Sequence, residues 1–291
     1  MKQTLQSFLS LLMCLIIISA CVPIEELLDQ NSEDEAEVEE ELDDDEVVLY
    51  PQLTLEQKKR AEQLTSLFEN GTIEIKYNVC EEIHDGRGFT CGRAGFTSAT
   101  GDLLEVVKRY TAKRPSNPLA SYLSALKILA AEESDSVIEL IGLDNAWASA
   151  SNDPLFRAVQ DSVVDELYFI PSQQYADELG LETALARAVL YDTIIQHGDG
   201  DDPDSIAVLI TRTGIRAGGT PAEGINEEVW LDHFLTLRRA TLANAYDPET
   251  RVAWAESVGR CDVFRAMLED GNFALHGPIH INTEEYDEVI P

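Results

Sequence analysis

Residues 69–102 read ENGTIEIKYNVCEEIHDGRGFTCGRAGFTSATGD, and they combine the end of a helix, an alternating apolar pattern and glycine-rich turns. Four acids are distributed through this stretch, at Glu69, Glu81, Asp85 and Asp102. Tight turns bring distant side chains together, and glycine makes such turns because it adopts backbone conformations that other residues avoid. The stretch therefore predicts a small sheet and a functional site built on carboxyl groups.

A helix is predicted directly before this stretch. Residues 54–57, Thr-Leu-Glu-Gln, have the pattern of a capping box, in which the first and fourth residues satisfy each other's backbone amides. Ala61, Leu64 and Phe68 follow at helical spacing, and Asn70-Gly71 is a typical helix end. We expect one helix from the capping box to Gly71.

Glu69 falls in the last turn of this predicted helix. The helix dipole presents partial negative charge at that end, which disfavours a carboxylate. Burial beside Phe68 would act in the same direction, because burial disfavours the charged form. A carboxyl group that stays protonated can donate a proton, so Glu69 is predicted to act as an acid.

A strand is predicted after Gly71, because apolar and polar residues alternate there. If the alternation continues, Glu81 and Asp85 lie on the same side as the apolar residues, although a single bulge would invert this order. We expect a small antiparallel sheet near residues 73–97. The apolar positions are Ile73, Ile75, Tyr77 and Val79, and the polar ones are Glu74, Lys76 and Asn78.

The charge of the chain is strongly acidic but unevenly spread. The net charge is −33 over 291 residues, yet residues 25–46 alone hold 14 acids and no Lys or Arg. Residues 47–291 keep a net charge of −20. An acidic body argues against a nucleic-acid partner, and it is compatible with a cationic substrate or simply with solubility.

The N-terminus has the pattern of an export signal. Lys2 precedes an apolar run, residues 8–20, which is too short to span a membrane and typical of a signal peptide. The run ends Ile-Ser-Ala-Cys21, which resembles a bacterial lipobox, in which the cysteine becomes the lipidated first residue of the mature protein. We expect residues 1–20 to be a lipoprotein signal peptide and Cys21 to anchor the exported protein to the cell envelope; an ordinary signal and secretion are the alternative.

Two further segments are predicted. Residues 21–50 are too rich in like charges to form a core, so we expect an acidic, disordered linker. Residues 51–291 contain no internal repeat and no second linker, and we expect one mainly helical (α+β) domain there, with further helices beginning at Asp102, Asn117-Pro118 and Asp153-Pro154. Residues 181–195 are apolar almost all round and predict the most buried helix.

The cysteines and histidines leave two questions open. Cys80 and Cys91 are equidistant from Asp85-Gly86, so a hairpin turn there would bring them together, and export permits a disulfide. Cys261 would remain unpaired. His276 and His280 lack further ligands nearby, so we predict no metal and no cofactor.

Three separated blocks carry a resemblance to a known family. GRGFTCGRAGFTSATGDLLEVV, LYDTIIQHGDGDDP and TPAEGINEEVWLDHFLTLRRA occur in the order found in glycoside hydrolase family 46, the chitosanases, and the likeness runs from about Glu56 to Pro278. The resemblance implies endo-hydrolysis, with inversion, of chitosan, a β-1,4-linked glucosamine polymer. It also implies a two-lobed, lysozyme-like helical fold with a cleft between the lobes. We expect the enzyme to be a monomer.

The resemblance assigns roles to the residues that match the family's motifs. Asp192, Arg238 and Arg251 match a charged network that links the lobes, and His197 matches a histidine of the cleft and is expected to bind substrate. The roles implied at the cleft are general acid for Glu69, general base for Asp85, holding the attacking water for Thr90, orienting the base for Arg87, and binding substrate ammonium groups for Glu81 and Asp102.

The chemistry supports the catalytic pair independently. Inverting hydrolysis needs one protonated carboxyl for the leaving oxygen and one carboxylate that activates water on the opposite face. Arg87 lies two residues from Asp85, and its positive charge would keep that base ionised.

Two other functions remain open at this point. A lysozyme-like enzyme could cut N-acetylated glycan such as peptidoglycan, but the acids of the predicted cleft favour free amines. A tethered, non-catalytic glycan-binding protein is the other alternative, and the presence of Glu69, Asp85 and Thr90 argues against it.

Overall fold

The computed structural model describes residues 53–84, 86–248 and 250–291. The predictions for the signal peptide, Cys21 and the acidic linker lie outside these residues, and so does Asp85. Residues 48–291 form one compact unit.

The first helix, α1 (Leu55–Asn70), begins and ends as the sequence predicts. Thr54 and Gln57 form the capping box, and Gly71 ends the helix in the left-handed conformation, with φ of 65°. The face of α1 that packs on the core carries buried residues from Ala61 to Phe68. The next residue, Glu69, lies at the exposed end of the helix.

Helices make up most of the described chain, and together with a small antiparallel sheet they confirm the predicted fold class. Short 3₁₀ turns occur at Ala120–Tyr122, Ile138–Leu140 and Pro221–Glu223. The helices after α1 are α2 (Asp102–Lys113), α3 (Leu123–Glu132), α4 (Leu143–Ala150), α5 (Pro154–Val164), α6 (Ile170–Leu179), α7 (Ala184–His197), α8 (Ile206–Ala217), α9 (Glu227–Ala243), α10 (Arg251–Ala255) and α11 (Gly259–Glu269).

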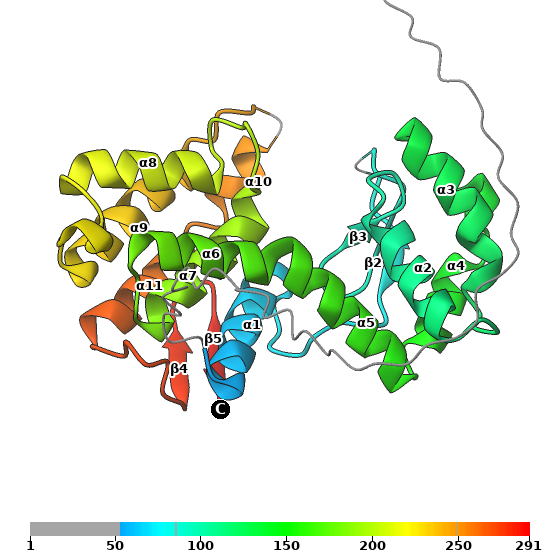
Figure 1. Cartoon of the computed structure of the whole chain (residues 1–291), viewed down its shortest axis with the longest axis horizontal. Coiled ribbons are helices and arrows are strands. Elements are labelled where there is room, and N and C mark those ends of the chain that lie inside the picture. Colours follow the sequence, from blue (N-terminus) through cyan, green and yellow to red (C-terminus); the bar gives the residue numbers. More distant parts are fainter. Residues whose placement is uncertain (1–52, 85, 249) are drawn as a thin grey trace, which may run out of the picture. The chain divides into compact units, whose positions relative to one another are not determined.

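One continuous helical rod spans the folded unit. It consists of α5, a π-helical segment named η3 (Asp165–Phe169), and α6, and the backbone stays helical through both junctions. Its α5 end packs on α2, and its α6 end packs on α7. Figure 1 shows the sheet with α2, α3 and α4 at one end of the rod, and α7 to α11 around the other.

The predicted sheet is present, but it begins later than expected. Strands β1 (Cys80–Glu82), β2 (Phe89–Cys91) and β3 (Phe96–Thr97) pair antiparallel in that order. The prediction of a strand over residues 73–79 was wrong, because no other described strand pairs with that segment.

Side chains hold the middle of the segment 73–79 in place, and at its end the Val79 carbonyl accepts a hydrogen bond from the Gly92 amide at 2.7 Å. The carbonyl oxygen of Tyr77 accepts hydrogen bonds from Trp147 Nε1 at 2.9 Å and Gln160 Nε2 at 3.1 Å. The Tyr77 hydroxyl donates to Asp161 at 2.8 Å. The alternating apolar pattern therefore reflects partial burial of the apolar residues in a segment that bends and forms no strand.

A second, two-stranded sheet was not predicted. Strands β4 (Ile279–Asn282) and β5 (Asp287–Ile290) pair antiparallel, and β5 lies against α1. Ile279 and Ile281 are buried while His280 and Asn282 are exposed, which is the alternation of a strand with one buried face. Helix α7 is the most buried helix, as predicted, with 12 buried residues.

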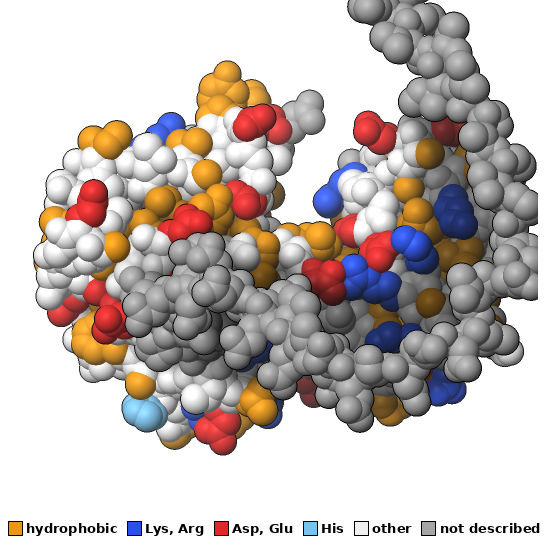
Figure 2. Space-filling view, in the orientation of Figure 1, with side chains coloured by type: hydrophobic (Ala, Val, Ile, Leu, Met, Phe, Trp, Pro, Cys, Tyr) orange, Lys and Arg blue, Asp and Glu red, His pale blue; other side chains and the backbone are white. Residues whose placement is uncertain are grey.

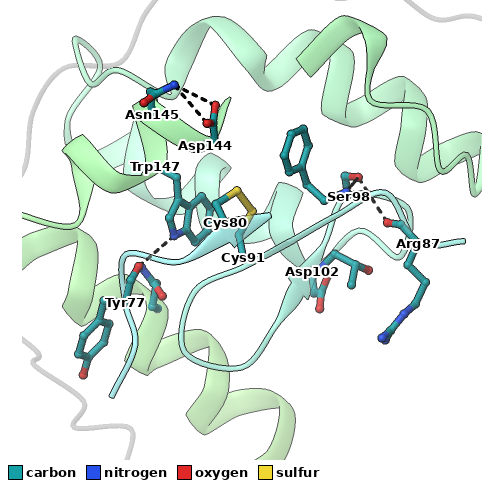
Figure 3. The surroundings of a disulfide bond; sticks show 12 residues. Tyr77, Cys80, Arg87, Cys91, Ser98, Asp102, Asp144, Asn145 and Trp147 are labelled. Carbon is teal, nitrogen blue, oxygen red and sulfur yellow. Dashed lines mark hydrogen bonds between the residues drawn. A yellow bond between two sulfur atoms is a disulfide. The ribbon is translucent and has the colours of Figure 1, made fainter. Parts of the chain in front are cut away.

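The structure contains the disulfide between Cys80 and Cys91, and Cys261 is unpaired and buried. The bond joins the pair of residues next to Glu81 and Thr90 in the β1–β2 ladder. Figure 3 shows the Trp147 indole beside it. The bond therefore closes the hairpin whose turn carries residues 83–88.

Replacing both cysteines in a Cys80→Ser/Cys91→Ser variant should lower the free energy of unfolding by about 3 kcal/mol or less, since the bond closes a short loop and restricts the unfolded chain. Denaturant unfolding of the variant and of the wild type measures this difference. Mass measurement after alkylation provides the control. If Cys80 and Cys91 both react with the alkylating agent without reductant, the disulfide is not formed in solution.

Candidate active site

A cavity of about 810 Å³ opens between the C-terminal half of α1, the three-stranded sheet, and the residues of η3 and α7. Its volume is within the range of small-molecule sites. Glu69 lies on the α1 wall, and Glu81 and Thr90 lie on the wall formed by the sheet. Figure 2 shows the surface hollowed between the α10 side and the β3 side, with acidic and basic side chains along the sheet-side wall.

Glu69 lies at the edge of the cavity and does not have the environment predicted for it. Its side chain is 39% exposed, and Oε1 accepts a hydrogen bond from Arg260 Nη2 at 2.6 Å. Phe68 packs on Phe264 and Tyr286, and the Arg260 guanidinium lies 5.4 Å from the centre of its ring. The burial that was expected to keep Glu69 protonated is therefore absent, and its closest charged contact is a cation.

Arg260 extends this contact into the core. Its Nη1 lies 3.9 Å from Asp192 Oδ2, and the same oxygen accepts from Arg238 Nη2 at 2.6 Å. All three side chains are at most 1% exposed. Burial alone would lower the pKa of the Arg260 guanidinium, but Asp192 and Glu69 raise it above its usual value, so the group stays charged.

The prediction that Arg251 belongs to this network was wrong, since Arg260 occupies that place. Arg251 is exposed at the start of α10, where Nε donates to the Ala245 carbonyl at 2.9 Å and Nη2 donates to the Tyr246 carbonyl at 3.2 Å. A signal for Arg260 existed in the sequence, because it lies in a mostly apolar helical run that includes Cys261 and Phe264.

His197 was predicted to bind substrate, and the structure places it in the buried network. Its side chain is 6% exposed, and its Nδ1 lies 2.8 Å from the Asp204 carbonyl oxygen. Arg238 Nε donates to Nε2 at 3.4 Å. Burial and the neighbouring Arg238 hold the pKa of His197 well below its usual value. A neutral ring that donates from Nδ1 and accepts at Nε2 satisfies both contacts, so His197 supports Arg238 and does not line the cavity.

The sheet-side wall carries the other predicted residues. Glu81 is exposed, lies opposite Thr90 in the ladder and shares the cavity with Val79, as the predicted alternation requires. Thr90 Oγ1 is buried and has no hydrogen-bond partner among the described residues. Arg87 also lines the cavity. A hydroxyl in this position can bind a water molecule or a substrate hydroxyl.

Asp102 lines the cavity and also holds the turn at the start of α2. Its Oδ1 accepts from the Thr97 amide, the Thr100 hydroxyl and the Leu103 amide, each at 2.8 Å. Burial raises the pKa of Asp102, and these hydrogen bonds oppose that shift. All three bonds use one carboxylate oxygen, so a role in the fold accompanies the predicted role in binding.

Other features of the cavity were not predicted from the sequence. Glu62 and Arg93 lie on its floor, and Tyr168 reaches it from η3. No group of His, Cys, Asp and Glu residues in the described chain has the arrangement of a metal site. Within residues 53–84, 86–248 and 250–291, no helix is long and apolar enough to cross a membrane.

Comparisons with known proteins agree with this geometry. The profile of glycosyl hydrolase family 46 matches residues 63–279. A chitosanase of Bacillus subtilis (strain 168) is 54% identical over 245 residues, which cover 84% of this chain and 88% of that protein. A chitosanase of Streptomyces sp. (strain N174) is 37% identical over 230 residues, which cover 78% of this chain and 79% of that protein.

Solved structures show the same fold. The crystal structure of native chitosanase from Bacillus subtilis MY002 matches with a TM-score of 0.76 and 54% identity, over 82% of this chain and all of that one. The complex of a family 46 chitosanase from Gynuella sunshinyii with chitotetraose matches with a TM-score of 0.75 and 48% identity, over 82% of this chain and 99% of that one. The chain therefore belongs to glycosyl hydrolase family 46.

Proposed function

We propose that this protein is an endo-chitosanase, which hydrolyses β-1,4 linkages between glucosamine units with inversion at the anomeric carbon. The observation that carries this proposal is the position of Glu69 on one wall of a single cavity that Glu81, Arg87 and Thr90 line from the sheet side. The chitosanases to which the chain is similar, and the bound chitotetraose of one of them, support the substrate class.

In this proposal Glu69 donates a proton to the leaving glycosidic oxygen. Asp85, which lies between β1 and β2 in the sequence, accepts a proton from the attacking water on the opposite face of the sugar. Thr90 Oγ1, which is buried and has no partner among the described residues, holds that water, and Arg87 orients the base. Inverting enzymes place their two carboxyl groups about 6.5–9.5 Å apart, so that a water molecule fits between the sugar and the base.

The contact between Glu69 and Arg260 gives the acid a fixed direction. A hydrogen bond of 2.6 Å to a fully buried guanidinium restricts the rotamers of a side chain that is otherwise 39% exposed. Once Glu69 has donated its proton, Arg260 stabilises the carboxylate that remains. The contact with Arg260 therefore holds Glu69 in place and stabilises its negative charge after proton transfer.

Glu69→Gln and Asp85→Asn should each lower kcat on polymeric chitosan by about 10²- to 10⁴-fold while leaving the fold intact, because each change removes one proton-transfer group. Rates of reducing-end formation measure the loss, and circular dichroism checks the fold. Glu74→Gln, at an exposed acid outside the cavity, is the matched control. Retention of more than about a tenth of the wild-type rate by either active-site variant would refute the assignment.

We propose that Glu81 and Asp102 recognise the ammonium groups of the substrate. Glu81→Ala and Asp102→Asn should therefore raise KM more on fully deacetylated chitosan than on partly acetylated chains, since an acetylated unit carries no charge. The change to Asn keeps the acceptor that holds the turn at Thr97. Glu82→Ala is the control on the same strand, because Glu82 does not line the cavity. An equal rise in KM on both substrates would show that these acids have a structural role and do not recognise the ammonium groups.

Product analysis on chitosans of graded acetylation separates the proposed activity from its alternatives. A chitosanase releases more product as acetylation falls, whereas an enzyme for N-acetylated glycan shows the opposite trend. A glycan-binding protein without catalytic activity releases none.

We further propose that the protein is exported and attached to the cell envelope through a lipid on Cys21. The support is the apolar run over residues 8–20, which ends in a lipobox-like Ile-Ser-Ala-Cys sequence. In the same proposal residues 21–50 are an acidic linker, and residues 51–291 are the catalytic domain, which acts as a monomer without cofactor.

Changing Cys21 to Ser should release the protein from membranes and leave catalysis unaltered, because the proposed lipid attaches far along the chain from the active site. Membrane fractionation and oligomer hydrolysis measure the two effects. A truncated protein that begins near Leu49 should hydrolyse short oligomers at the wild-type rate. Membrane attachment of the Cys21→Ser protein would disprove the anchor, and a folded but inactive truncation would show that the linker belongs to the catalytic domain.

A further inference from the structure

A second charged cluster lies on the floor of the cavity, separate from the one that holds Glu69. Its centre is Arg93, in the turn after β2, whose side chain is only 4% exposed. Arg93 Nη2 lies 3.2 Å from Glu62 Oε1 on α1, and Nη1 donates to Asp161 Oδ1 on α5. The backbone amide of Arg93 also donates to Gln160 Oε1 at 3.1 Å.

These contacts connect three elements that carry different parts of the active site. Glu62 precedes Glu69 by seven residues, about two helical turns, so both lie on the cavity face of α1. Arg93 follows Thr90 by three residues, and the Gly92 amide between them donates to the Val79 carbonyl at 2.7 Å. One guanidinium therefore joins the helix of the acid to the strand of the water-binding threonine, with α5 as the common support.

Arg93 is suited to this connection. Burial opposes its charge, but Glu62, Tyr191 and Asp161 raise the pKa of the guanidinium, so it stays charged. Burial raises the pKa of Glu62, and Arg93 opposes that shift. A planar guanidinium offers donors in two fixed directions, whereas an ammonium group presents one point charge on a flexible stem. Lysine at this position would therefore keep the charge but lose the fixed link between the two helices.

We propose that Arg93 is a positioning residue for hydrolysis, which sets the distance between Glu69 and the sheet wall that holds the water and the base. The inverting geometry requires a defined gap between the two carboxyl groups. A displacement of about 1 Å between reacting groups can lower the rate about 100-fold, so we expect loss of the Arg93 contacts to lower kcat. Among the described residues, Arg93 forms its hydrogen bonds and ion pairs with Glu62, Asp161 and Gln160, and neither Glu81 nor Asp102 is among these partners, so we expect a smaller effect on KM. This inference rests on the proposed chitosanase activity.

The test compares Arg93→Lys with Arg187→Lys. Arg187 is a matched control, since its side chain is 0% exposed and pairs with Asp177 at 2.6 Å, but it does not line the cavity. Both variants should lose thermal stability. Below the unfolding range, Arg93→Lys should lower kcat by about 10- to 100-fold with KM changed less than about twofold, and Arg187→Lys should keep both constants.

Glu62→Gln tests the same link without changing the turn, and it provides a folded variant if Arg93→Lys does not fold. Glu62→Gln should lower kcat severalfold. Arg93→Lys should lower kcat by a smaller factor in the Glu62→Gln background than in the wild type, because the effects of residues in one network are not additive. A kcat within twofold of wild type for either single variant would overturn the proposal, and so would a loss confined to KM. An inactive wild type would instead refute the proposed function.

Discussion

The position of the proposed acid depends on a charge buried in the core. Asp192 has no exposure, and two buried arginines, Arg238 and Arg260, approach the same carboxylate oxygen. A buried charge without a partner costs several kcal/mol, so the three groups must come together as the helices pack. Only Arg260 reaches outward, to Glu69 at the end of α1. The orientation of a cavity side chain is therefore determined by the packing of α7, α9 and α11.

The opposite wall of the cavity has a different kind of support. The β1–β2 hairpin is tied by the disulfide between Cys80 and Cys91, and the segment before it is held by Trp147 and Gln160 through the Tyr77 carbonyl. One wall is thus stabilised by ion pairs in the core, and the other by a covalent bond and neutral hydrogen bonds, while the ion pairs of Arg93 join the two walls. The two systems differ in their response to salt, to pH and to reductant.

Local sequence signals predicted the local structure well and the contacts between distant elements poorly. The capping box of α1 and the glycine at its C-terminal end could be recognised from the sequence because they depend on neighbouring residues. Residues 73–79 have the alternating pattern of a strand but no partner strand in the described part of the chain. Pairing depends on contacts between segments that are distant in the sequence, which a local pattern does not reveal. Arg260 and Glu69 are separated by 191 residues, so no local pattern joins them. The family resemblance supplied the roles at the cavity, yet it placed Arg251 in a network that contains Arg260 in the structure.

The π-helical segment within the rod has a geometric consequence. Each residue of an α-helix advances by about 100°, so the wider turn at Asp165–Phe169 changes the angular phase between the helices on either side of it. That phase lets α5 face α2 while α6 faces α7, and it directs Tyr168 into the cavity. The segment therefore connects two separately packed groups of helices and also sets the rotation of one helix relative to the other.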